Sequence, residues 1–147
     1  MPGKGALVSQ PMELSDKELA FLGQHHSAAM ITVTADRTAK VSRVGVGLVD
    51  GRLWSSGTAD RMRTKRLRRD PHCTLFVFEA EFAWLALETT VSILDGPDAP
   101  RQNLRLFRLL RGDAEGPEFD EEQYLRAMVD EKRLIYEFEV QKSYGII

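Results

Sequence analysis

Residues 40–56, with the sequence KVSRVGVGLVDGRLWSS, decide the fold class of this chain. In the first ten of these residues every second side chain, from Ser42 to Leu48, lies on one largely apolar face, which is typical of a half-buried strand. Asp50-Gly51 is one of the strongest short hairpin signals, and it predicts that residues 52–56 return as a second strand. Such a short connection joins antiparallel strands, because parallel strands need a long crossover. The stretch therefore predicts an antiparallel sheet and excludes an all-parallel α/β fold.

The opposite face of the first strand carries two glycines, Gly45 and Gly47, two residues apart. Because glycine has no side chain, another group can approach the backbone closely at these positions. We therefore expect ligand contact with this strand.

Further helices and strands are predicted on both sides of the hairpin. A helix begins where Ser15 and Glu18 can form a reciprocal capping box, and it ends near residue 25. The other predicted helices are residues 60–70, 97–110 and 120–132, and the other predicted strands are residues 28–34, 73–79, 82–94 and 134–140. The unbroken apolar run at residues 75–78 indicates a strand that is buried on both faces. This order predicts a mainly β (α+β) fold, a small antiparallel barrel with helices packed outside it.

The composition restricts the class of protein. The 147 residues fit one domain, and 20 basic against 22 acidic residues do not make a polycation that coats nucleic acid or anionic lipid. No apolar run approaches the length of about 20 residues that a membrane helix needs. The single cysteine, Cys73, cannot form an internal disulfide, and the first ten residues lack the pattern of a secretory signal. We therefore expect a cytoplasmic protein that binds neither nucleic acid nor membrane.

Side-chain catalytic clusters are missing from the sequence. His25, His26 and His72 have no second ligand at metal-binding spacing, so no metal site is predicted. There is no phosphate-binding glycine loop and no nucleophile elbow. We can name no catalytic residue, and if the protein is an enzyme, its reactive chemistry belongs to a bound cofactor.

A basic segment is the main functional feature. Residues 60–70 carry six positive and two negative charges, a local net charge of +4 in a chain whose net charge is −2. Arg61, Lys65 and Arg68 recur at helical spacing, so a helix capped by Asp60 would place a basic face beside the free amides of its first turn, with the Thr64 hydroxyl nearby. This arrangement suits a phosphate group.

Two other interpretations of the basic segment remain open. It could be a solvated helix face balanced by the acidic residues 113–122. Nucleic-acid binding is disfavoured, because the segment lacks the interleaved aromatic residues of a single-strand groove.

The segment RMRTKRLRRDP at residues 61–71, which follows the two strands of the hairpin, resembles the phosphate-binding signature of the pyridoxamine 5'-phosphate oxidase-like split β-barrel superfamily. Within it, the chain is most similar to the actinobacterial F420-dependent flavin/deazaflavin oxidoreductases of the B branch, because residues 124–129 and 143–145 also match. The resemblance covers residues 14–147 and leaves residues 1–13 as an N-terminal arm. It implies a six-stranded antiparallel split β-barrel of the FMN-binding type with peripheral helices, assembled as a homodimer that holds cofactors at its interface.

The resemblance also implies a set of cofactor-binding residues. Arg61, Arg63 and Thr64 would hold the cofactor phosphate, and Arg63 stands where many members have lysine. The expected lining of the ring and ribityl chain is Ser42, Arg43, Val44, Ser56 and Thr58, and Trp84 is expected to wall the pocket.

The activity implied by the resemblance is a hydride transfer from reduced coenzyme F420, an 8-hydroxy-5-deazaflavin, to a conjugated or unsaturated small molecule. One alternative is an oxidoreductase that uses flavin mononucleotide (FMN) in the same site. The other is a carrier of a cofactor or haem with no catalytic activity, since a phosphate site can bind without reacting.

Overall fold

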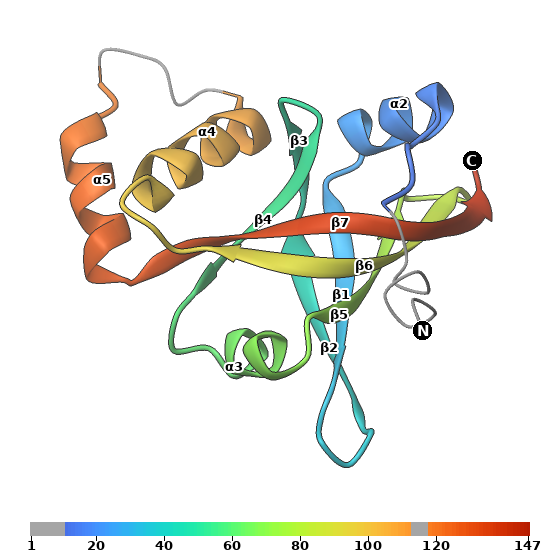
Figure 1. The fold of residues 1–147 in the computed structure, drawn as a ribbon. Coiled ribbons are helices and arrows are strands. Elements are labelled where there is room, and N and C mark those ends of the chain that lie inside the picture. The colour runs from blue at the N-terminus through green and yellow to red at the C-terminus, as the bar shows by residue number, and fades with distance from the viewer. Residues whose placement is uncertain (1–10, 113–117) are drawn as a thin grey trace.

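The structure, a computed structural model, describes residues 11–112 and 118–147 of the chain. Its helices are α2 (Asp16–Gln24), α3 (Met62–Arg69), α4 (Ala99–Arg111) and α5 (Glu121–Asp130). Its strands are β1 (Ser27–Val33), β2 (Ala39–Gly45), β3 (Gly47–Val49), β4 (Arg52–Thr58), β5 (His72–Phe78), β6 (Trp84–Leu94) and β7 (Arg133–Ile146). Figure 1 shows the strands crossing the middle of the molecule, with the helices around them.

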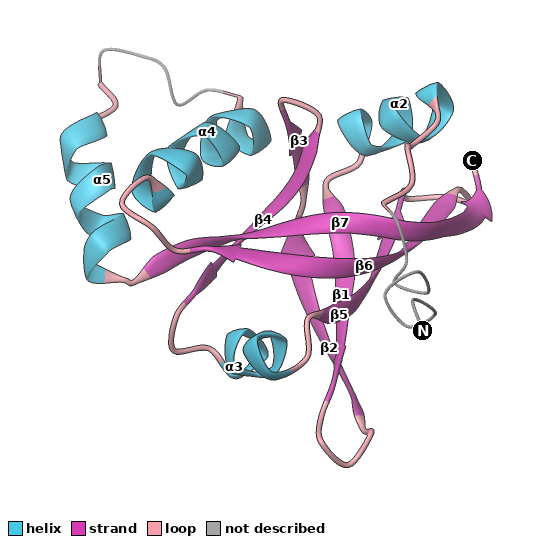
Figure 2. Ribbon diagram, in the orientation of Figure 1, coloured by secondary structure: helices cyan, strands magenta, loops and turns pink. Residues whose placement is uncertain are grey.

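All strands pair antiparallel in one sheet of order β2-β1-β5-β6-β7-β4-β3. The two outermost strands, β2 and β3, are consecutive in the chain and separated by Val46 alone, so the sheet must curl until its edges meet (Figure 2). The Ser55 hydroxyl donates to the Gly45 carbonyl across this closure at 2.7 Å. The predicted antiparallel barrel is therefore confirmed.

The sheet has seven strands rather than the expected six, because the strand predicted at residues 40–49 is divided. The Val46 amide leaves the ladder and donates to the His26 carbonyl at 2.8 Å. The first half pairs with β1 and the second half with β4, and the bend between them lets one chain segment belong to both edges of the barrel.

The barrel interior holds the main apolar core. It contains Met30 of β1, Leu75 and Val77 of β5, Leu87 of β6, and Leu134 and Tyr136 of β7, together with Leu22 of α2 and Leu67 of α3. The interpretation of residues 75–78 as buried on both faces was wrong. Leu75 and Val77 are fully buried, whereas Phe78 on the other face is 40% exposed.

Helices α2 and α5 begin where their predicted caps place them. Ser15 and Glu18 form the reciprocal capping box of α2, and the Asp120 carboxylate accepts the Gln123 amide at the start of α5. Helix α4 packs on the outer face of β3 and β4, where a second apolar cluster joins Trp54 to Leu106 and Ile135. Figure 1 shows α4 and α5 together at one side of the sheet and α3 at the lower side.

Helix α4 also explains the two glycines that were expected to meet a ligand. A methyl group added at Gly47 would lie 2.5 Å from Leu109 Cδ2, and one added at Gly45 would lie 3.3 Å from Leu110 Cδ1. The close approach to the bare strand is therefore made by leucines of α4, and the expectation of a ligand there is corrected.

The expected N-terminal arm, residues 1–13, lies mostly outside the described residues. Within the part that is described, the Met12 amide donates to the Val140 carbonyl of β7 at 2.8 Å. Among the described helices, none combines the length and hydropathy that crossing a membrane requires.

We predict that Gly57→Ala lowers the free energy of unfolding by about 1–3 kcal/mol, the usual cost of overpacking a core. A side chain at Gly57 would overlap the Tyr136 ring, which is fully buried and cannot move aside. Gly23→Ala is the control, because Gly23 is exposed within α2 and has open space around it. It should raise stability by about 0.5–1 kcal/mol. Chemical denaturation measures both, and equal effects would contradict the packing at Gly57.

Candidate functional site

Helix α3 connects β4 to β5 and begins with the basic segment. The Asp60 side chain does not cap this helix, as had been expected, because its carboxylate accepts the Thr58 hydroxyl at 2.7 Å. That hydrogen bond holds the pKa of the Asp60 carboxyl below its usual value. The N-cap residue is Arg61 instead, and it makes no side-chain capping bond. The first-turn amides are thus left without a capping carboxylate.

Thr64 fixes α3 to the barrel. Its side chain is fully buried, and its hydroxyl donates to the Thr58 carbonyl at 2.7 Å and also bonds the Tyr136 hydroxyl. This position makes Thr64 a packing residue that holds the start of α3 against β4 and β7.

The arginines of α3 divide into two groups. Those of the second half are bound to the rest of the chain: Arg66 Nε donates to the Thr32 hydroxyl at 2.9 Å, Arg68 pairs with Asp95 at 2.9 Å, and Arg69 donates to the Val33 carbonyl at 2.8 Å. They tie the C-terminal end of α3 to β1 and to the end of β6.

The arginines at the start of α3 are different. Arg61 is exposed, and the Arg63 guanidinium lies over the Tyr136 ring, with its Cζ 5.8 Å from the ring centroid. Within the described part of the chain, Arg63 Nε is buried and has no hydrogen-bond partner. A buried charged donor without an acceptor is costly, so this end of α3 is suited to an anion.

The acidic stretch at residues 113–122 was the alternative partner of the basic helix. Residues 113–117 lie outside the described residues. In the remainder, Glu121 pairs with Arg101 and Arg108 of α4, both at 3.4 Å. These contacts are with another helix, so they do not support the interpretation of α3 as a face balanced by the acidic stretch.

The expected ring-lining residues on β2 divide between its two faces. Val44 is buried in the barrel core, and Ser42 lies on the same inner face, opposite Met30 of β1. Arg43 points outward, with Nη2 3.4 Å from the Ser27 hydroxyl. Of these three residues, Arg43 is the one whose side chain is open to a ligand.

Ser56 and Thr58 lie on the outer face of β4, two residues apart. The Ser56 hydroxyl donates to Asn103 Oδ1 of α4, and Thr58 is 8% exposed. Thr58 lies beside the start of α3, so these residues and Arg61 and Arg63 are brought to one end of the sheet.

Trp84 lies at the other end of the sheet. It begins β6, whereas Leu94 at the end of β6 pairs with Ile135, close to Thr58. Ten residue steps along a strand separate these two ends by about 33 Å. One chain therefore does not bring Trp84 together with Arg63.

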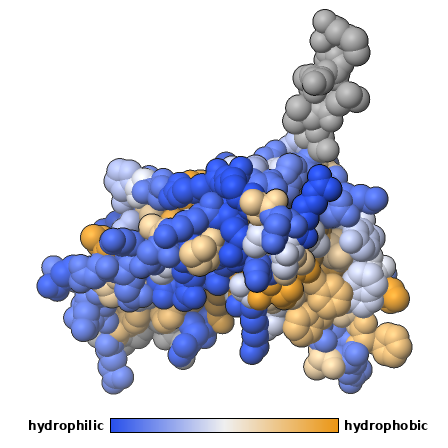
Figure 3. Space-filling view, turned by 90° about the horizontal axis from the view of Figure 1, so that it is seen from below, coloured by the Kyte–Doolittle hydropathy of each residue, from blue (hydrophilic) through white to orange (hydrophobic). Residues whose placement is uncertain are grey.

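Trp84 instead belongs to an aromatic cluster on the outer face of the sheet. Its ring lies 5.5 Å from that of Phe76 and 6.2 Å from that of Tyr144. Tyr144 is 47% exposed, and Phe82 in the preceding loop is 83% exposed. Figure 3 shows apolar side chains gathered toward the side of the molecule where β7 ends. We call the residues Phe76, Phe78, Phe82, Trp84, Tyr144 and Ile146 the outer aromatic face.

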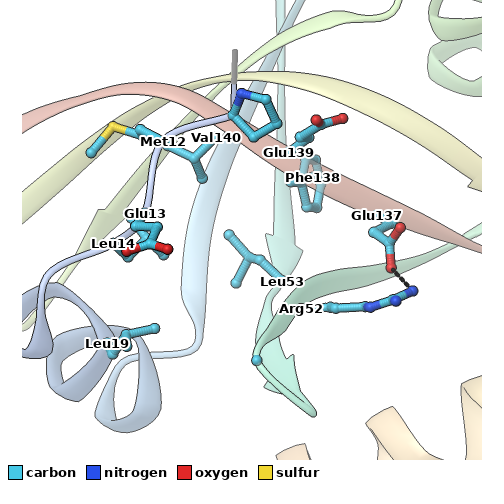
Figure 4. A pocket seen from close by; sticks show the side chains of 12 residues that line it. Met12, Glu13, Leu14, Leu19, Arg52, Leu53, Glu137, Phe138, Glu139 and Val140 are labelled. Atoms are coloured by element: carbon cyan, nitrogen blue, oxygen red, sulfur yellow. Dashed lines mark hydrogen bonds and ion pairs between the residues drawn. The ribbon is translucent and has the colours of Figure 1, made fainter.

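Of the cavities that the described residues form away from α3, two bear on the predicted site. One of about 510 Å³ lies between the segment before α2 and strands β4 and β7 (Figure 4), and none of the predicted site residues lines it. The other, of about 360 Å³, lies between α4 and α5, and Ser56 lines it. Sequence reasoning missed this second cavity, which we call the α4–α5 pocket. The apolar stripe of Leu106, Phe107 and Leu110 was its one available signal.

We predict that Thr64→Val destabilises the protein by about 1–3 kcal/mol, because it removes a buried hydroxyl and leaves its partners unsatisfied. Thermal and chemical unfolding of the cofactor-free chain measure this effect. Unchanged stability would contradict the packing role of Thr64, whose predicted contact with a cofactor phosphate stays a prediction.

Comparison with models of protein families gives no match, and neither does comparison with curated proteins. Solved structures do match in fold. The conserved hypothetical protein Rv2991 from Mycobacterium tuberculosis has a TM-score of 0.76 at 16% identity, over 92% of this chain and 86% of that one. A structure named as an F420 reductase has a TM-score of 0.67 at 16% identity, over 89% of this chain and 98% of its own.

A Listeria innocua protein that is provisionally named a pyridoxamine 5'-phosphate oxidase is also similar in fold. Its TM-score is 0.66 at 17% identity, over 90% of this chain and 98% of its own. At this identity the likeness concerns the fold. Together with the closed antiparallel sheet described above, it shows that the chain has the split β-barrel fold of the pyridoxamine 5'-phosphate oxidase-like proteins.

Proposed function

We propose that this chain is an oxidoreductase that binds a flavin or deazaflavin cofactor by its phosphate, at the start of α3. The observation that carries the proposal is the buried Nε of Arg63, which has no hydrogen-bond partner among the described residues. A phosphate oxygen would satisfy this donor with a charge-assisted hydrogen bond.

Three features of the chain fit an anionic group there. The Arg61 and Arg63 guanidiniums and the uncapped amides at the start of α3 all favour negative charge. The Thr64–Tyr136 contact holds the first turn in place before anything binds. The other three arginines of α3 are engaged with the barrel, so they do not compete for the phosphate.

Coenzyme F420 is the cofactor we favour, on the resemblance of residues 61–71, and FMN is the alternative for the same phosphate site. Either cofactor, when bound, would supply a hydride from its reduced ring. The chain then has to orient a conjugated substrate and exclude water, for which no side-chain acid–base pair is required. The presence of an F420 reductase and an oxidase-type protein among the fold relatives supports this class of activity.

We propose that the active form is a homodimer in which the outer aromatic face of each copy packs on its partner. The face is apolar and exposed, and such patches on a folded chain are typical of association surfaces. In a dimer, Trp84 of one copy could wall a ring held by Arg43, Arg61 and Arg63 of the other, which a single copy cannot do. Ser42 and Val44 would then contribute backbone rather than side chains.

The cofactor site is tested by Arg61→Ala and Arg63→Ala, with Arg69→Ala as the matched control at the other end of the same helix, where the Arg69 guanidinium donates to the Val33 carbonyl. Each of the first two variants should weaken cofactor binding by about 1.5–3 kcal/mol, or roughly 10- to 150-fold in Kd, whereas the control should change it little. Titration calorimetry with F420 and with FMN measures this and identifies the cofactor.

Equal affinity in all three variants would contradict the site. Tight FMN binding without F420 binding would replace the favoured cofactor by the alternative. Binding without any turnover of a quinone or an unsaturated lactone would assign the protein to the carriers.

The dimer is tested by Tyr144→Lys, which places a charge on the outer aromatic face. An unpaired ammonium is costly to bury, so this variant should be a monomer of 16.6 kDa while the unmodified chain has twice that mass. Val129→Lys is the control, because Val129 is 63% exposed on α5. Light scattering with size-exclusion chromatography measures the mass, and a monomeric unmodified chain would contradict the proposed assembly.

A further inference from the structure

The α4–α5 pocket has the composition of a small-molecule site. Its volume of about 360 Å³ lies within the range of ligand pockets, and its apolar lining consists of Leu106, Phe107, Leu110 and Met128. The Phe107 and Tyr124 rings are 5.0 Å apart at its side, and the Met128 thioether adapts readily to aromatic rings.

The charged groups of the pocket cancel. Glu131 and Arg133 both line it, and they pair with each other at 3.0 Å. A charged ligand would lose its hydration without meeting a free countercharge, so the pocket favours an uncharged one.

The polar groups of the pocket determine whether a ligand must donate or accept a hydrogen bond there. The Tyr124 hydroxyl donates to the Asn103 carbonyl at 3.3 Å, and the Ser56 hydroxyl donates to Asn103 Oδ1. Both hydrogens point to Asn103, which leaves the two hydroxyl oxygens to act as acceptors. Burial raises the pKa of Tyr124, so its hydroxyl stays protonated at neutral pH.

We propose that the α4–α5 pocket binds an uncharged aromatic alcohol, with its ring between Phe107, Leu110 and Met128 and its hydroxyl donating to the Tyr124 oxygen. This site is separate from the phosphate site on α3, and its occupancy requires no cofactor. The two sites are connected through strand β4, because Ser56 lines the pocket and Thr58, two residues later, lies beside the start of α3.

The test uses the full chain without cofactor and two naphthalenes of nearly equal shape. 2-Naphthol can donate a hydrogen bond, and 2-methoxynaphthalene cannot. Calorimetry should give one site per chain for 2-naphthol, with an affinity about 3- to 10-fold higher than that for 2-methoxynaphthalene, the factor expected for one hydrogen bond. Tyr124→Phe should remove this difference by weakening 2-naphthol alone.

A second pair of variants tests the location. Met128→Trp fills the pocket and should weaken both naphthalenes, whereas Val129→Trp, which is exposed on the same helix, should leave both unchanged. Absence of 2-naphthol binding, or equal affinities for the two compounds in the unmodified chain, would overturn the proposal. Should Met128→Trp fail to fold, the Tyr124→Phe comparison decides alone, and a difference that persists in that variant would also overturn it.

Discussion

The buried contact between Thr64 and Tyr136 determines the geometry on which the candidate site depends. Tyr136 is fully buried in β7, and its ring has room because Gly57 on the neighbouring strand has no side chain. The hydroxyl pair ties the first turn of α3 to β4 and β7, and the Arg63 guanidinium lies over the face of the same ring. The contact therefore fixes the position of a positive charge at the end of the barrel. A flexible arginine on an exposed loop would lose more conformational entropy on binding than one that is already held in this way.

The bend at Val46 determines which parts of the sheet are covered and which are exposed. Because β2 and β3 are two halves of one segment, the sheet closes and its inner face is filled by the main core. Helix α4 then covers the outer face on the β3–β4 side, where the glycines of that segment admit its leucines. The outer face on the β5–β6 side has no such cover among the described residues, and its aromatic side chains are left for association. The fold thus separates a covered surface, which contains the α4–α5 pocket, from an open one.

The sequence was sufficient where a structure is determined by neighbouring residues. The Ser15–Glu18 and Asp120–Gln123 caps placed two helix starts correctly, and Asp50-Gly51 placed the hairpin, where both residues adopt positive φ. It was insufficient where the determining contact comes from a distant part of the chain. The break at Val46 depends on the His26 carbonyl, and Thr58 diverts Asp60 from capping α3. Phe76 and Phe78 were wrongly predicted to be core residues, because no local sequence pattern tells whether a second layer covers the outer face of a strand. The phosphate segment was recognisable from residues 61–71, but the difference between Arg63 and the engaged arginines required the fold.

The most direct test of the phosphate site is a crystal structure of the chain with its cofactor bound. We expect a phosphate oxygen within hydrogen-bond distance of Arg63 Nε, about 2.7–2.9 Å, with the guanidinium still over the Tyr136 ring. A phosphate bound elsewhere on the chain, with Arg63 Nε still lacking an acceptor, would contradict this expectation.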